Sequence, residues 1–299
     1  YFPNEINSQG GEAEKDAKLA NGTFGMSVAN GSPIELDSYK KIMPDLNSRE
    51  TVAYAKTTGN PELRKLWLEK IIEKNPDLKT KKISLPVLVP GLTAALSYVA
   101  DLFVGENKPL LAADPCWDNY ELIASARRGA IFHQFKCFEK GKFNVPGIEA
   151  AMKADAEKYG SVRIILNFPQ NPSGYSPTKD EAKQLVKIVK EIAESGKKVL
   201  VLSDDAYFGL NYEDYIEPQA LFAYMADLHE NVFAIKADGP TKEDFAWGFR
   251  TGFITFGSKG LSDQQITALT TKFMAAIRSS VSCSSTVSQS LVIHALKYP

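Results

Sequence analysis

Cysteine and histidine are scarce in this sequence, each occurring three times among 299 residues. Cys116, Cys137 and Cys283 are odd in number and far apart, which favours reduced thiols in a cytoplasmic protein over a disulfide framework. The histidines are equally scattered, and neither a Cys/His cluster nor an HExxH motif occurs. We therefore expect no metal site.

Long apolar runs and an excess of one charge are also missing. No apolar stretch reaches the roughly 18 residues that a membrane-spanning helix needs, and no signal peptide is recognisable. Thirty-five basic and thirty-six acidic residues leave a net charge of −1, without the basic surplus typical of proteins that bind nucleic acids or acidic membranes. We expect a soluble, cytoplasmic protein that uses neither partner.

What the sequence does contain is a regular alternation of short apolar runs with amphipathic segments. Apolar runs such as "VRIILNF" and "KVLVLSD" are typical of strands buried on both faces, as in a parallel sheet covered by helices. Strands are predicted near 83–89, 109–113, 130–135, 162–167, 198–203, 232–236 and 250–256. Helices are predicted near 60–75, 91–103, 117–129, 146–159, 178–195 and 215–226. This order predicts a three-layer αβα fold around a mostly parallel, seven-stranded sheet.

The first part of the chain differs from the rest. Residues 1–50 are rich in Gly, Asn and Ser and show little periodicity, so they are interpreted as an arm and loops. Residues 51–299 form the α/β domain in this interpretation. The chain starts at Tyr1 and stops inside an apparent helix, so we expect it to be a fragment.

In open α/β sheets, ligands gather beyond the carboxyl ends of the strands. The fourth strand runs into "NFPQNPSG", which contains Asn171, and the fifth ends at "SDDAYFG", which contains Asp204 and Tyr207. After the sixth strand, Lys242 precedes Arg250 by eight residues. Each of these residues alone is more often a turn, a cap or a solvated side chain. Together they place an amine, a guanidinium, a carboxylate, a phenol and an amide at one edge of a sheet.

Two further features follow the first two strands. Gly91, Leu92 and Thr93 stand at the start of a predicted helix, whose free amides and dipole favour a phosphate. Trp117 follows a proline turn after the second strand. The P-loop, GxGxxG and GxSxG motifs do not occur.

These motifs resemble those of the class I/II aminotransferases, pyridoxal-phosphate (PLP) enzymes of fold type I. "NFPQNPSG" is similar to the family's N-x-P-x-N-P-[ST]-G, and "DDAY" to its D-x-A-Y. "TKEDFAWGFRTG" is similar to its pattern of Lys, Arg eight residues on and Gly two further. The resemblance covers nearly the whole chain and implies that residues 51–299 are a PLP-binding large domain.

By this resemblance, Lys242 would hold PLP as an internal aldimine and move a proton during catalysis, which its amine chemistry allows. The alternative, Lys236, lies inside a predicted strand and lacks the interval to an arginine. Asp204 would pair with the pyridine nitrogen, while strand alternation turns Asp205 away. Tyr207 and Asn171 would hydrogen-bond the 3′-oxygen of the ring.

The resemblance also implies which residues bind the phosphate and the substrate. Arg250 would grip the phosphate together with the amides of Gly91, Leu92 and Thr93, and Trp117 would stack on the ring and line the substrate site with Asn171. Tyr54, in "AYAKTTGNPELR", would reach the phosphate of a neighbouring subunit, which implies a homodimer. Gly31 would approach the substrate carboxylate, although it is equally interpretable as a turn glycine.

The sequence departs from the family pattern in two places. Where the family usually has Ser or Thr three residues before the lysine, this chain has Gly239, so Thr241 would supply a hydroxyl to the phosphate instead. The arginine that binds the substrate carboxylate belongs to the family's C-terminal small domain, and nothing in this sequence corresponds to it.

The implied function is transamination between an L-amino acid and a 2-oxo acid. Because the cofactor carries the chemistry, the same scaffold could instead perform β-elimination, decarboxylation or a synthase reaction. A third hypothesis is a PLP-binding regulatory module.

Overall fold

The computed structural model describes residue 15 and residues 25–298. The first elements of this part are β1 (Val28–Ala29), β2 (Ser32–Pro33), α2 (Asp37–Ile42), η1 (Met43–Asp45), α3 (Ser48–Thr51), α4 (Pro61–Lys74), η2 (Pro76–Thr80), β3 (Val87–Val89) and α5 (Leu92–Phe103). There follow β4 (Leu110–Asp114), α6 (Asn119–Glu121), η3 (Leu122–Ala126), β5 (Phe132–Lys136), β6 (Phe138–Glu139), β7 (Lys142–Phe143), α7 (Val145–Tyr159) and β8 (Ser161–Asn167). The last are α8 (Lys179–Glu194), β9 (Lys198–Asp204), α9 (Leu221–Met225), β10 (Val232–Asp238), η4 (Trp247–Phe249), β11 (Gly252–Gly257), α10 (Asp263–Arg278) and α11 (Thr286–Lys297).

Seven strands form one central sheet in the order β3-β11-β10-β9-β8-β4-β5. The neighbours from β10 to β5 pair in parallel. Strand β11 is antiparallel to both β10 and β3. The prediction of a mostly parallel, seven-stranded sheet is confirmed, and each strand lies within or next to its predicted range.

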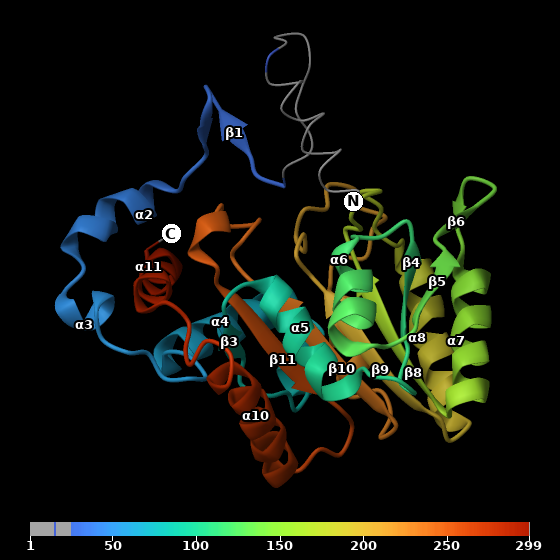
Figure 1. The fold of residues 1–299 in the computed structure, drawn as a ribbon. Helices are drawn as coiled ribbons and strands as arrows, with labels where there is room; N and C mark the ends of the chain where they lie inside the picture. The colour runs from blue at the N-terminus through green and yellow to red at the C-terminus, as the bar shows by residue number, and fades with distance from the viewer. Residues whose placement is uncertain (1–14, 16–24, 299) are drawn as a thin grey trace.

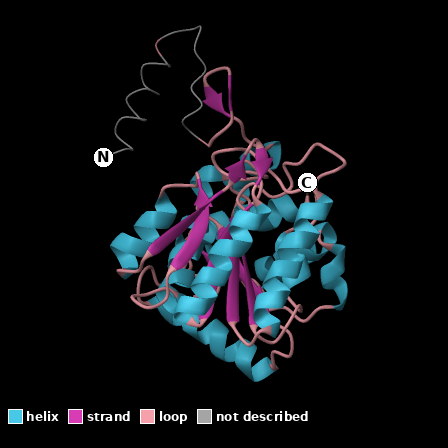
Figure 2. Ribbon diagram, turned by 90° about the vertical axis from the view of Figure 1, so that its right-hand side faces the viewer, coloured by secondary structure: helices cyan, strands magenta, loops and turns pink. Residues whose placement is uncertain are grey.

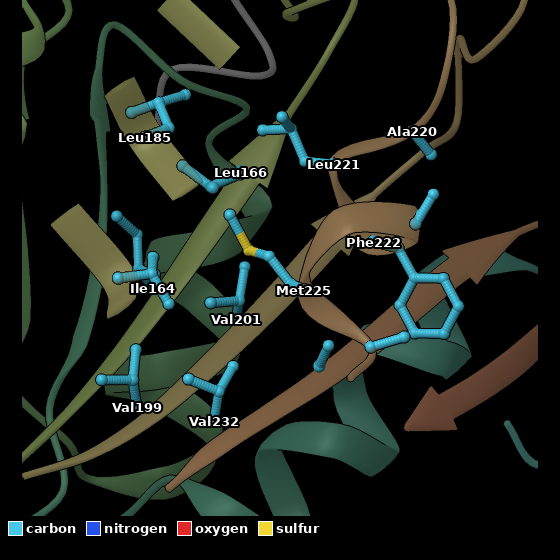
Figure 3. Packing of buried hydrophobic residues seen from close by; sticks show 14 of the residues in the cluster. Ile164, Leu166, Leu185, Val199, Val201, Ala220, Leu221, Phe222, Met225 and Val232 are labelled. Atoms are coloured by element: carbon cyan, nitrogen blue, oxygen red, sulfur yellow. The ribbon is translucent and has the colours of Figure 1, made fainter. Parts of the chain in front are cut away.

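Helices cover both faces of this sheet, as the three layers in Figure 2 show. On one face, α5, α6 and α10 pack on strand residues such as Ile165 and Leu202, and these helices lie in front of the sheet in Figure 1. On the other face, α4, α7, α8 and α9 pack on residues such as Ile164 and Val201. Figure 3 shows this second cluster, with Met225 of α9 between the strands and α8. Alternate residues of a strand thus serve opposite layers, which explains why the runs are apolar throughout.

Three predicted ranges differ in detail from the structure. The helix predicted near 215–226 is shorter, because the amide of Ala220 donates to the side chain of buried Asn75 and α9 begins only after it. The helix predicted near 117–129 is divided into α6 and the wider, π-type turn η3. The strand predicted near 83–89 is regular only over its last three residues.

Residues 25–50, predicted as arm and loops, contain the short helix α2, all but the last residue of α3 and the β1–β2 hairpin, which projects from the layers in Figure 1. Tyr39 of α2 is buried and packs edge-on against Phe249. The division of the chain near residue 50 stays a prediction. Among the described helices, none is both long and apolar enough to cross a membrane.

Candidate active site

A cavity of about 660 Å³ opens at the edge of the sheet where the parallel strands end. Its lining comes from the segments after β3, β4, β8, β9 and β10, together with Gly25. The predicted site residues among its lining are Leu92, Thr93, Trp117, Asn171, Asp204, Tyr207, Thr241, Lys242 and Arg250. Residues far apart in the sequence therefore meet at one cavity, as the strand-end argument predicts.

Asp204, the last residue of β9, is the buried carboxylate of this cavity. Its Oδ2 accepts a hydrogen bond of 2.6 Å from the hydroxyl of Tyr120, and its Oδ1 accepts one of 3.2 Å from the amide of Ala206. Burial raises the pKa of Asp204 to about 6, although these two hydrogen bonds favour the ionised form. Among the described residues, no cation is in direct contact with this carboxylate, which is therefore suited to receive one.

The neighbouring Asp205 points to the opposite face of the sheet. There it pairs with Lys236 of β10 at 2.5 Å, and the ammonium of Lys236 also lies 3.5 Å from Asp238. All three side chains are buried. Lys236 and Asp205, the alternatives considered from sequence, thus neutralise each other outside the cavity.

Lys242 stands in the turn after β10 and extends into the cavity. Its Nζ donates to the carbonyl oxygen of Gly25 at 3.1 Å and lies 5.3 Å from the centre of the Tyr207 ring. Burial lowers the pKa of Lys242, the cation of Arg250 lowers it further, and Asp204 opposes the change. A larger fraction of this amine is therefore neutral, and nucleophilic, than in an exposed lysine.

Gly25 approaches the amine closely from the N-terminal segment. A Cβ atom at this position would lie 2.9 Å from Nζ of Lys242 and 3.1 Å from the hydroxyl of Tyr207. The backbone of residue 25 therefore borders both polar groups, and only glycine fits without displacing them.

The "NFPQNPSG" turn is tied to the end of β9 by its first asparagine. The side-chain amide of Asn167 donates to the carbonyl oxygen of Asp204 at 2.7 Å, and its Oδ1 accepts the amide of Asn171 at 2.8 Å. The peptide bonds Phe168–Pro169 and Asn171–Pro172 are cis. The two hydrogen bonds of Asn167 hold Asn171 at the cavity, which Asp204 also lines.

Arg250 packs against the start of α5. Gly91 has a φ of +90°, and a Cβ there would lie 2.6 Å from Nη2 of Arg250, so the guanidinium rests on the glycine backbone. The guanidinium also donates to the carbonyl oxygen of Trp247 at 3.2 Å. A cation and the free amides of Leu92 and Thr93 thus face the same space, which suits an anion such as phosphate.

Two features fit this cavity to PLP, and a third explains the departure from the family pattern at residue 239. Thr241 is buried, lines the cavity, and its hydroxyl has no hydrogen-bond partner among the described residues. Gly239, at the position of the family's hydroxyl, is packed so closely against the carbonyl oxygen of Thr251 that a Cβ would lie 2.7 Å from it. The lining supplies an amine for an aldehyde, a carboxylate for a ring nitrogen and a cation for a phosphate.

Of the predicted site residues, Gly91 meets the cavity only through its contact with Arg250, and two others lie elsewhere. Gly31 is in the exposed turn of the β1–β2 hairpin, and a Cβ there would meet nothing within 4 Å. Tyr54 is 95% exposed and borders a separate polar pocket near α11. Neither position lines the cavity within this chain, and the roles of all predicted site residues remain predictions.

Sequence reasoning missed Tyr120, Asn167 and Gly25. Tyr120 follows Trp117 by three residues, the interval that puts two side chains on one side of a helical turn, and this spacing could have indicated it. Asn167 stands at the end of β8 as Asp204 does at the end of β9, and the two positions pair across the strands. Nothing in the sequence around Gly25 points to the cavity.

Comparisons with known proteins agree with this geometry. In a sequence comparison, the aminotransferase class I and II family matches residues 25–299. The chain is 25% identical over 207 residues to an aspartate aminotransferase of Sulfurisphaera tokodaii, an alignment that covers 69% of this chain and 48% of that protein.

Two solved structures share the fold. An aminotransferase of Anaerococcus prevotii has a TM-score of 0.85 at 24% identity, over 97% of this chain and 71% of that chain. An aromatic-amino-acid aminotransferase of Burkholderia pseudomallei, solved with covalently bound pyridoxal phosphate, has a TM-score of 0.73 at 16% identity, over 92% and 67% of the two chains.

The chain spans about half the length of the curated relatives it matches. The family match nevertheless extends over all the described strands and helices, including every element that lines the cavity. The chain therefore belongs to the aminotransferase class I and II family.

Proposed function

We propose that this chain binds PLP through Lys242 and performs transamination between an L-amino acid and a 2-oxo acid. The observation that carries the proposal is the shared cavity of Lys242, Asp204, Tyr207 and Arg250, in which the amine has a lowered pKa. When bound, PLP supplies an electron sink for the electrons released as a proton leaves the substrate α-carbon.

In this proposal, different residues bind different parts of the cofactor. Arg250, the amides of Leu92 and Thr93 and the hydroxyl of Thr241 hold the phosphate. Asp204 faces the ring nitrogen, and its ionised form, disfavoured by burial alone, gains a cationic partner there. Trp117 covers the ring.

The remaining residues act on protons. Lys242 Nζ, with its lowered pKa, holds the proton taken from the substrate α-carbon and returns it. Tyr207 and Asn171 donate hydrogen bonds to the phenolic oxygen of the ring. The burial of Tyr207 raises its pKa, so its hydroxyl stays protonated and can donate.

The first test is a visible absorption spectrum of the protein mixed with PLP. We expect wild type to form a yellow, covalent complex with PLP. Lys242→Ala should lack the absorption band of this covalent complex. Lys65→Met is the control for removing a lysine, since Lys65 is exposed on α4 and does not line the cavity. A wild type that stays colourless with added PLP would refute the proposal.

Transamination itself is tested by incubating the complex with amino acids. We expect one equivalent of 2-oxo acid per bound PLP, with pyridoxamine phosphate as the other product. Release of ammonia or carbon dioxide would instead indicate one of the other PLP reactions.

The homodimer and the cytoplasmic location belong to the same proposal. Tyr54 does not line the cavity of its own chain and is almost fully exposed, which is consistent with a role at a neighbouring subunit. The three cysteines are free thiols.

A further inference from the structure

Helix α4 contacts the segments on both sides of Lys242, although none of its residues lines the cavity. Trp67, Lys70 and Lys74 carry these contacts. They are spaced by three and four residues, so they lie on one face of the helix. We call these three residues the α4 anchor.

Trp67 holds the chain before the lysine. Its indole Nε1 donates to Oδ1 of Asp238 at 3.1 Å, and its ring stacks on Phe253 of β11 with 4.5 Å between the ring centres. Trp67 is buried, and Asp238 is the last residue of β10. The point where the chain leaves the sheet is therefore fixed by a buried hydrogen bond and an aromatic contact.

The two lysines hold the chain after Lys242. Nζ of Lys70 lies 2.8 Å and 3.0 Å from the two carboxylate oxygens of Asp244 and 3.2 Å from Glu243. Lys74 forms a second ion pair with Glu243. The Lys70 and Asp244 side chains are only 16% and 21% exposed, so solvent screens their ion pair less than a surface pair.

The turn itself has few other restraints. The amides of Asp244 and Ala246 both donate to the carbonyl oxygen of Pro240, at 3.1 Å and 3.3 Å. The side chain of Lys242 makes one hydrogen bond within the described residues, to Gly25. The position of the amine thus depends on where the turn is held, and a displacement of 1 Å at a reacting group can cost about a hundredfold in rate.

We propose that the α4 anchor positions Lys242, by fixing Asp238 on one side and Glu243 and Asp244 on the other. Trp67, Lys70 and Lys74 are positioning residues that act through the turn and touch neither cofactor nor substrate. The inference rests on the proposed binding of PLP by Lys242.

The experiment distinguishes positioning from a long-range electrostatic effect by comparing the directions in which two substitutions of opposite charge act. Lys70→Met removes a cation and Asp244→Asn removes an anion. If the two substitutions acted only through the electric field of the removed charges, they would shift the pKa of Lys242 in opposite directions. If the ion pair positions the amine, both weaken PLP binding.

We expect each substitution to raise the dissociation constant of PLP about tenfold, measured by absorbance titration of the apoprotein. The double variant should lose no more than the weaker-binding single variant, since all three lack the same ion pair. Lys70→Arg should recover most of the affinity. Lys65→Met is the matched control, because Lys65 is an exposed lysine of the same helix.

Circular dichroism confirms that each variant is folded, and the pH midpoint of the bound PLP absorption band gives a second readout. This midpoint should shift in the same direction in Lys70→Met and Asp244→Asn. Opposite shifts, or PLP affinities equal to that of Lys65→Met, would overturn the inference. A wild type that binds no PLP through Lys242 would instead refute the proposed function, so the two failures are distinguishable.

Discussion

Asp204 is a buried carboxylate whose environment stabilises it only in part. Burial raises its pKa to about 6, well above the ordinary value of 3.8, while Tyr120 and the amide of Ala206 oppose that change. The stability of the unloaded protein and the binding of the proposed cofactor favour different protonation states of this residue. The unloaded protein is more stable when Asp204 is protonated, whereas the proposed cofactor requires it ionised.

This conflict predicts a pH dependence of stability in the protein without PLP. Because the folded pKa lies above the unfolded one, the folded state binds the extra proton, and stability falls as pH rises from about 4 through about 6. One pKa unit corresponds to about 1.4 kcal/mol, so the fall is about 3 kcal/mol in the free energy of unfolding. Asp204→Asn should lack this fall when both proteins are unfolded by urea between pH 4 and pH 7.

Tyr120→Phe supplies a second arm of the same experiment. It removes a hydrogen bond that lowers the pKa of Asp204, so the fall in stability should extend to higher pH than in wild type. Stability curves of wild type and Asp204→Asn that run parallel over the whole range would contradict the assigned pKa.

At the scale of single residues, the sequence predicted those that carry distinctive chemistry. Lys242, Asp204 and Arg250 are recognisable because each reactive group lies beyond the end of a predicted strand or between two of them, and because their motifs resemble those of the family. Tyr120 and Asn167 act on Asp204 through single hydrogen bonds. Such partners depend on side-chain directions across strands, which periodicity does not contain.

At the scale of elements, the start of α5 and the start of β11 are fitted to each other. Gly91 has backbone angles of 90° and 166°, a region essentially restricted to glycine. A Cβ at Gly252 would lie 2.7 Å from the carbonyl carbon of Gly91. Two glycines therefore allow helix, strand and the Arg250 guanidinium to meet.

We predict that Gly91→Ala both destabilises the fold and disturbs PLP binding. The positive φ costs about 1–3 kcal/mol of unfolding free energy, and the new methyl group displaces the guanidinium from its place. Gly129→Ala is the control, because Gly129 also has a positive φ of +61° but a Cβ there meets nothing within 4 Å. Both variants should lose stability in urea, and only Gly91→Ala should bind PLP more weakly by absorbance titration. Equal PLP affinities would show that the contact with Arg250 is dispensable.

Elements with continuous apolar character were predictable, and their orientation was not. The runs around β8 and β9 predicted buried strands because both of their faces are covered. Nothing in the composition of β11 distinguishes an antiparallel strand from a parallel one. The start of α9 depends on one distant contact between Asn75 and Ala220, which a local pattern cannot reveal.

On the scale of the whole molecule, exposed apolar side chains concentrate in the N-terminal segment. Met26, Val28, Ile34, Met43, Val52 and Tyr54 are all exposed, Val52 by 83%. Such a concentration is typical of a surface that is covered by a partner, and the proposed homodimer provides one.

We therefore predict that Val52→Asp weakens self-association at least about tenfold, since it places an unpaired charge in an apolar interface. Sedimentation analysis over a range of concentrations measures this change. Met274→Asp is the control, because Met274 is also exposed but belongs to α10, which lies away from the hairpin in Figure 1. A chain that sediments as a monomer in wild-type form would exclude the homodimer.

The reversed direction of β11 has one more consequence. Lys242 and Arg250 lie on the connection of a single hairpin, β10–β11, while Asp204 belongs to the separate strand β9. A fluctuation that separated β9 from β10 would change the distance between the amine and the carboxylate, whereas the guanidinium would move together with the amine because both lie on the same connection. A group bound by Arg250 would thus keep its distance from the Lys242 amine during such fluctuations of the sheet.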